Sequence, residues 1–146
     1  GSSATTRVRH MRRILLAAAA LAALAQPASA SVVARISNAN QRMHVYVNGA
    51  LAHVWPVSTA RRGYVTPAGS YRVQRMERMW YSRKYNMSPM PYAMFFRGGY
   101  AIHGTGAVRS LGSRASHGCV RLATGNARTL YGLTQRHGGA QIVVTN

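Results

Sequence analysis

The sequence of 146 residues is almost without acidic side chains. It holds 19 Lys and Arg residues against one carboxylate, Glu77, for a formal net charge of +18 at pH 7. Mechanisms that need two carboxylates, such as those of aspartic proteases and ordinary glycosidases, are therefore excluded. An H-E-x-x-H metalloprotease motif is also absent. The positive charge favours contact with anionic polymers and lipid head groups, and it limits nonspecific self-association.

Cysteine is nearly absent as well. The one thiol, Cys119, has no partner within the chain for a disulfide, and it lies in the stretch SHGCVR that begins at Ser116. A buried, inert cysteine is one interpretation, because free cysteines are among the most buried residues. The neighbours favour a functional thiol instead. Polar groups such as His117 and Arg121 are costly in an ordinary core strand, and Gly118 lets the backbone approach a ligand closely.

Long apolar runs are confined to the N-terminal part. Residues 11–30 combine a basic start, the apolar run Ile14–Ala25 and a small-residue end, a pattern typical of a secretory signal peptide cleaved after Ala30. Residues 1–10 are interpreted as an extension from cloning or from the gene model. The alternative, a membrane anchor, needs roughly 20 apolar residues, so no stable anchor is expected. We therefore expect residues 31–146 to be an exported, single-domain protein of the periplasm or cell wall, where an unpaired thiol is a liability unless it is buried or used.

The sequence pattern of residues 31–146 predicts short strands. Residues 32–37 and 42–47 alternate polar and apolar side chains, and Asn48-Gly49 between the second run and its continuation is a dipeptide that type I′ hairpin turns favour. Pro56 indicates an edge strand or a strand end. The fold class is therefore predicted as mainly β.

The second half predicts another hairpin and one helix. A hairpin is expected about Gly98 and its neighbouring glycine, with His103 near the end of the second arm. A helix is expected with Thr124 as its N-cap and an end at Gly138, followed by a strand over residues 140–146. Residues 75–92 fit no period, so they are interpreted as a functional loop or lid beside a cleft, or as an anchored surface segment.

The side chains that remain can support thiol chemistry. A histidine within hydrogen-bond reach of Cys119 would generate the thiolate, and His103 and His117 are both candidates. With acids almost missing, a backbone carbonyl is expected to orient the base. The amides of Gly118 and Cys119 can turn toward an oxyanion. Zinc held by the two histidines and the thiol is an alternative, although the spacing is not a standard zinc pattern.

These motifs carry a resemblance to a known family. The order IHG at residues 102–104 followed by SHGCVRL at residues 116–122 resembles the L,D-transpeptidase catalytic domain of bacterial peptidoglycan metabolism, the YkuD-like family. Residues 57–73, with a TP-x-G turn at Thr66, are similar to the same domain. The resemblance covers residues 32–146, and it implies a β-sandwich-like single domain with one C-terminal helix.

The resemblance also implies roles. Cys119 would be the nucleophile, His103 the general base and the carbonyl of Gly104 its orienter, with no metal and no cofactor. Many relatives carry Asn where this chain has Arg121. His117 is expected to hold the loop rather than act as a base. The residues expected to shape the site and its oxyanion hole are Ser116, His117, Gly118 and Arg121.

The implied reaction joins peptidoglycan stem peptides. The thiolate would attack the carbonyl before the terminal D-alanine of a tetrapeptide stem, which would release D-alanine and form a thioester. An amine of a neighbouring stem or a wall-attached protein would then attack the thioester and take over the stem. Anionic cell-envelope polymers are further expected partners because guanidinium groups pair with carboxylates. Two alternatives stay open: an L,D-carboxypeptidase or hydrolase using the same thioester, and a non-catalytic basic envelope-binding module. Nucleic acid is not an expected partner of an exported protein.

Overall fold

The computed structural model describes residues 30–146. The predicted extension at residues 1–10 and the predicted signal peptide at residues 11–30, apart from Ala30, lie outside the described residues. In chain order the elements are β1 Val32–Ser37, β2 Arg42–Val47, β3 Ala50–Pro56, β4 Gly69–Arg72, β5 Arg75–Ser82, β6 Ser88–Arg97, β7 Tyr100–Thr105, η1 Val108–Ser110, β8 Val120–Ala123, α2 Thr124–Arg136 and β9 Gln141–Thr145.

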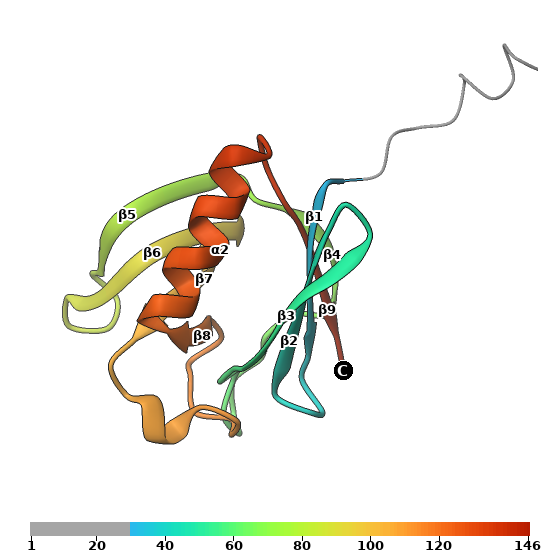
Figure 1. Cartoon of the computed structure of the whole chain (residues 1–146). Helices are drawn as coiled ribbons and strands as arrows, with labels where there is room; N and C mark the ends of the chain where they lie inside the picture. The colour runs from blue at the N-terminus through green and yellow to red at the C-terminus, as the bar shows by residue number, and fades with distance from the viewer. Residues whose placement is uncertain (1–29) are drawn as a thin grey trace, which may run out of the picture.

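The strands form two sheets (Figure 1). One has five strands in the order β3-β2-β1-β9-β4, and the other has four in the order β5-β6-β7-β8. Helix α2 packs against β6, β7 and β8 of the second sheet. Within the described residues the protein is thus mainly β with one α-helix near its C-terminal end, which confirms the predicted fold class.

The four-stranded sheet has two faces with different surroundings. Phe96, Ile102 and Leu122 join the main core, together with Leu130 of α2 and the buried side chains of the five-stranded sheet. Burying each such side chain stabilises the fold by about 1.5–3 kcal/mol. The alternate positions face the other way, where Phe95 forms a smaller cluster that Cys119 contacts. Side-chain alternation therefore separates the core from the face that carries the polar site residues.

The predicted hairpins are confirmed. Asn48 and Gly49 have φ angles of 50° and 81°, as a type I′ turn between β2 and β3 requires. Gly98, with φ 50°, lies in the turn between β6 and β7. Pro56 ends β3, the edge strand of its sheet, where its missing N–H costs no ladder hydrogen bond.

Residues 75–92 are not a loop, so that part of the interpretation is wrong, although the segment does line a cavity, as was also expected. They form β5 and the first half of β6, an antiparallel hairpin. The period was hidden because no residue of the edge strand β5 is fully buried, while residues 93–96 of β6 are buried in succession. The ladder pairs Tyr81 with Pro89 and Met79 with Pro91, and prolines within a run argue against a strand.

The helix prediction needs one correction. The helix begins at Thr124, and the N-cap is Ala123, which makes no side-chain cap hydrogen bond. The hydroxyl of Thr124 instead donates to the carbonyl oxygen of Thr105 at 3.4 Å. It therefore joins the helix start to the end of β7. The helix ends at Arg136, shortly before Gly138, as the sequence predicts.

Candidate active site

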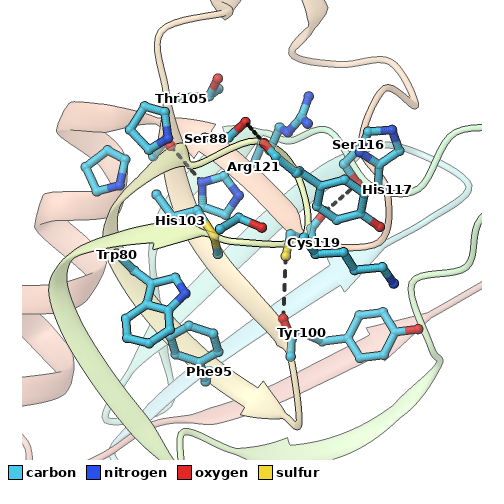
Figure 2. A pocket seen from close by; sticks show the side chains of 18 of the residues that line it. Trp80, Ser88, Phe95, Tyr100, His103, Thr105, Ser116, His117, Cys119 and Arg121 are labelled. Atoms are coloured by element: carbon cyan, nitrogen blue, oxygen red, sulfur yellow. Dashed lines mark hydrogen bonds between the residues drawn. The ribbon is translucent and has the colours of Figure 1, made fainter.

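A cavity of about 780 Å³ opens on the outer face of the four-stranded sheet. The β5–β6 hairpin forms one wall, and the loop before β8 forms the opposite wall (Figure 2). His103 and Cys119 both line this cavity, together with Ser116, His117 and Arg121. The fold thus brings to one place the residues that the sequence motifs singled out.

Parallel pairing of β7 and β8 explains why His103 and Cys119 meet. The register pairs Ile102 with Val120 and His103 with Arg121. Ile102 and Val120 are fully buried in the core. The residues on either side of them alternate to the opposite face, which is the floor of the cavity.

His103 is held as a neutral base. It is buried, and its Nδ1 lies 2.8 Å from the carbonyl oxygen of Gly104. Because a carbonyl only accepts hydrogen bonds, Nδ1 carries the ring proton and Nε2 is left as the basic atom. Burial lowers the pKa of His103 to about 4; the bond to Gly104 opposes this shift and the positive charge of Arg121 adds to it. The imidazole is therefore neutral at pH 7.

Cys119 is held as a thiol. Its Sγ donates to the carbonyl oxygen of Gly99 at 3.9 Å. Burial raises the pKa of Cys119, while a hydrogen bond from the Ala101 backbone and the charge of Arg121 both lower it. Since the imidazole is neutral and burial favours the protonated sulfur, the resting pair is imidazole and thiol, and the proton must move as the thiol attacks.

The loop before β8 is folded around Ser116. Its hydroxyl donates to the carbonyl oxygen of Cys119 at 2.6 Å and accepts the N–H of Gly118 at 3.0 Å. The expectation that the Gly118 amide serves an oxyanion is therefore wrong for this geometry, because Ser116 already takes that N–H. Only the amide of Cys119 remains from the expected pair.

Gly118 is required by both conformation and space. Its φ is +132°, and a Cβ there would lie 2.7 Å from the ring of Tyr100 and 3.0 Å from the carbonyl oxygen of Val65. Any side chain would be strained and would displace the backbone next to the thiol. The glycine of SHGC therefore lets the loop pack tightly against two other segments.

The comparisons with known proteins identify the family. Residues 31–144 match the family model described as the YkuD L,D-transpeptidase catalytic domain. The chain belongs to this family.

Solved L,D-transpeptidases share its fold. One from Mycobacterium smegmatis has 23% identity and a TM-score of 0.71 over 81% of this chain and 60% of that chain. One from Stackebrandtia nassauensis has 25% identity and a TM-score of 0.72 over 83% of this chain and 58% of that chain. The LD transpeptidase LdtMt1 in complex with imipenem has 23% identity and a TM-score of 0.70 over 79% of this chain and 59% of that chain. This chain thus spans about three fifths of the length of those proteins. No curated protein matches it significantly.

In this member of the family, His117 faces the hairpin wall. Its ring stacks on Tyr85 at the hairpin tip, with centroids 4.3 Å apart, and meets Tyr64 edge-on at 4.6 Å. Burial lowers the pKa of His117, and the nearby charges of Arg61, Arg121 and Lys84 lower it further. These contacts agree with the expectation that His117 holds the loop.

Arg121 is fixed by its backbone. Its N–H donates to the Ser58 carbonyl at 2.9 Å, and its own carbonyl accepts the Ser58 N–H at 3.0 Å. The guanidinium lies 3.5 Å from the carbonyl oxygen of Ala115 and lines the cavity. Its charge lowers the pKa of both His103 and Cys119, so it disfavours imidazolium and favours thiolate.

The hairpin wall holds residues that the sequence motifs did not reveal. Arg75 lies 4.5 Å from the ring centroid of Trp80 and 4.1 Å from that of Phe95, and all three line the cavity. The concentration of aromatic and basic residues in 75–92 was the available signal. It could not be assigned to one wall of a cavity without the strand pairing.

Residues 30–146 contain neither a metal-binding cluster of side chains nor a helix that could span a membrane. No group of three or more His, Cys, Asp or Glu side chains there is arranged to hold a metal ion. His103, His117 and Cys119 thus do not form the zinc site that was the alternative. None of the helices described has the length and hydropathy to cross a bilayer.

Proposed function

We propose that this domain is a peptidoglycan L,D-transpeptidase that uses Cys119 as its nucleophile. The observation that carries the proposal is the pairing of a neutral, carbonyl-oriented His103 with a protonated Cys119 in one cavity. Membership in the family supports the reaction class, and this pair would supply the nucleophile and the base that the class requires.

The first half of the reaction forms a thioester. His103 Nε2 takes the proton of Cys119 as Sγ bonds to the donor carbonyl carbon, and the carbonyl π electrons move to oxygen. When the tetrahedral intermediate collapses, the carbon–nitrogen bond breaks. The D-alanine amine takes the proton from His103, and the stem stays bound to sulfur.

The second half transfers the stem. An amine of a neighbouring stem or wall-attached protein attacks the thioester while His103 accepts its proton. The carbon–sulfur bond then breaks, and the thiol recovers the proton. If water attacks in place of the amine, the product is a shortened stem and the enzyme acts as a carboxypeptidase or hydrolase.

The charge of the cavity suits an acidic stem. Four cationic side chains line it, and none of its lining residues is acidic: the cations are Arg75, Arg83, Lys84 and Arg121. A peptide with several carboxylates would therefore meet only complementary charge. Stem peptides and other anionic envelope polymers are the proposed partners, and export to the periplasm or cell wall is the proposed location.

Imipenem tests the nucleophile. It is the ligand in the complex of the similar LdtMt1. Incubation with this domain should raise its intact mass by one adduct, and Cys119→Ala should remove the adduct. A folded wild-type protein without an adduct would contradict the thiol mechanism. Acylation should also be indifferent to a chelator, whereas a zinc enzyme would lose it.

A tetrapeptide muropeptide tests the acceptor. Mass analysis of the products should show a cross-linked dimer with release of D-alanine. A tripeptide alone would identify the carboxypeptidase, and unchanged substrate with a Cys119-independent binding signal would favour the non-catalytic module.

A further inference from the structure

Thr66 connects the TP-x-G turn to the catalytic loop. Its side chain is buried, and its hydroxyl donates to the carbonyl oxygen of Gly118 at 2.8 Å. The same hydroxyl accepts the N–H of Ala60 at 3.0 Å. An amide can only donate and a carbonyl can only accept, so the single hydroxyl hydrogen must point at Gly118.

The backbone of Thr66 is itself held by a buried hydrogen bond. The side-chain amide of Asn38, in the turn between β1 and β2, donates to the Thr66 carbonyl at 3.2 Å. The segment around Ala60 also bonds to the catalytic loop, where Arg61 N–H donates to the Ser116 carbonyl at 2.9 Å. Thr66 therefore acts on Gly118 from a firmly anchored backbone.

The bond to Gly118 fixes the direction of the next amide. The carbonyl of Gly118 and the N–H of Cys119 belong to one peptide group, and the described residues contain no cis peptide bond. In a trans peptide these two groups point in opposite directions. Thr66 does not line the cavity but Cys119 does, so holding the carbonyl toward Thr66 turns the Cys119 N–H away from that buried side.

The Cys119 N–H is also the amide left available. The N–H of Gly118 is taken by Ser116. Cys119 lies before β8, and among the backbone hydrogen bonds outside helices and strands in the described residues none uses its N–H. An unpaired amide beside a nucleophile is the arrangement that stabilises a developing oxyanion.

We propose that Thr66 is a positioning residue that fixes the Cys119 N–H as the oxyanion donor. The proposal rests on the proposed thiol mechanism and adds to it the residue that orients the oxyanion donor. When Sγ bonds to the acyl carbon, the electron pair displaced onto oxygen is met by this N–H. Without the Thr66 hydroxyl, the Gly118–Cys119 peptide loses the bond that holds its orientation.

The test compares two reactions of the same thiol. Acyl transfer from p-nitrophenyl acetate passes through an oxyanion, whereas alkylation by iodoacetamide displaces iodide from a saturated carbon and does not. Thr66→Val keeps the volume and removes the hydroxyl. It should lower the acylation rate about 100-fold, the size expected for one oxyanion donor, and change alkylation less than about twofold. Thr66→Ser should restore most of the acylation rate.

Thr59→Val is the matched control. Thr59 is buried in the same segment, and its backbone carbonyl accepts the N–H groups of Ala115 and Ser116, a contact that valine keeps. Its hydroxyl accepts from the side chain of Gln41 at 2.6 Å and makes no hydrogen bond to the catalytic loop. Acylation should therefore stay within about twofold of wild type. Thermal unfolding of every variant shows whether the protein is folded.

Several results would overturn the proposal. Equal losses of acylation and alkylation in Thr66→Val would indicate a merely structural role, and unchanged acylation or no rescue by Ser would contradict it outright. A wild-type thiol that alkylates but accepts no acetyl group would refute it as well. If the ester acylates Cys119 but muropeptides give no product, the proposed function fails while the role of Thr66 stands.

Discussion

The two walls of the cavity share one sheet ladder but differ in the contacts made outside it. The wall that carries Cys119 is joined to residues 57–66 by hydrogen bonds of the Thr66 hydroxyl and of the Ser116 backbone. The opposite wall, the β5–β6 hairpin, reaches the first through ring contacts of Tyr85 and His117 at its tip. Hydrogen bonds restrict both the distance and the angle between donor and acceptor, whereas stacked aromatic rings can shift relative to each other with little loss of contact.

The difference matches what each wall must do. Reacting atoms need a precise mutual geometry, which buried and mutually supporting bonds provide. The hairpin wall is partly exposed, and Asn86 and Met87 in its turn both have left-handed φ angles. Such a wall can adjust to the body of a long, variable substrate. Changes to the first wall should therefore affect chemistry, and changes to the second should affect binding.

The largest effect is expected on the first wall from His103→Asn. Removing the base should lower the rate of acyl transfer about 100- to 10,000-fold, because proton removal from the thiol becomes uncatalysed. The rate is measured as p-nitrophenol release from the acetate ester. His137→Asn, at the exposed end of α2, is the control and should change the rate less than twofold, roughly the scatter between independent surface sites. A small loss in His103→Asn would instead assign the base to another group.

The next effect is on stability at low pH. The unfolded chain protonates His103 near its ordinary pKa of 6.5, but the folded protein does so only near 4. The unfolded state therefore binds more protons between these values, and the free energy of unfolding falls as pH drops from 6.5 to 4, by about 3 kcal/mol.

Urea unfolding at pH 7, 5.5 and 4 measures this loss. His103→Asn should remove most of it, whereas His117→Gln on the junction between the walls should remove much less. A pH dependence that persists in His103→Asn would contradict the assignment.

A smaller effect is expected from Gly118→Ala. The added methyl meets Tyr100 and the Val65 carbonyl, and φ of +132° is strained for alanine. The free energy of unfolding should fall by about 2 kcal/mol, together with loss of acyl transfer. Gly125→Ala in α2 has open space at that position and should be neutral or slightly stabilising. Urea unfolding of both variants makes the comparison, and equal stabilities would show that the loop is not tightly packed.

The smallest effect is expected on the hairpin wall. Tyr85→Ala removes the ring that stacks on His117 and should cost about 1 kcal/mol of unfolding free energy. KM for a muropeptide should rise several-fold while kcat changes little, because the reacting groups stay in place. Tyr81→Ala, on the same hairpin but exposed and outside the cavity, is the control. A loss confined to kcat would mean that both walls serve the chemistry.

Local rules account for the parts of the fold that the sequence predicted. The turns at Asn48-Gly49 and Gly98 need left-handed φ, which restricts the residues that fit. The helix shows an apolar stripe that ends at a glycine. The β5–β6 hairpin showed no comparable sequence pattern. Strand β5 has no fully buried face, and part of β6 is buried on both faces. Pattern reasoning needs one buried face to show a period of two.

The site divides in the same way. The residue types of IHG and SHGC, together with the near absence of acids, favoured chemistry by a thiol and a histidine, with zinc as an alternative. Which of these groups work together depends on the tertiary fold. Parallel pairing of β7 with β8 places His103 and Cys119 on the same face of the sheet. Ser116 accepts the N–H of Gly118, and Thr66 binds the Gly118 carbonyl and so orients the amide of Cys119. A residue's type is local, but the direction of a hydrogen bond depends on a partner that lies far away in the chain.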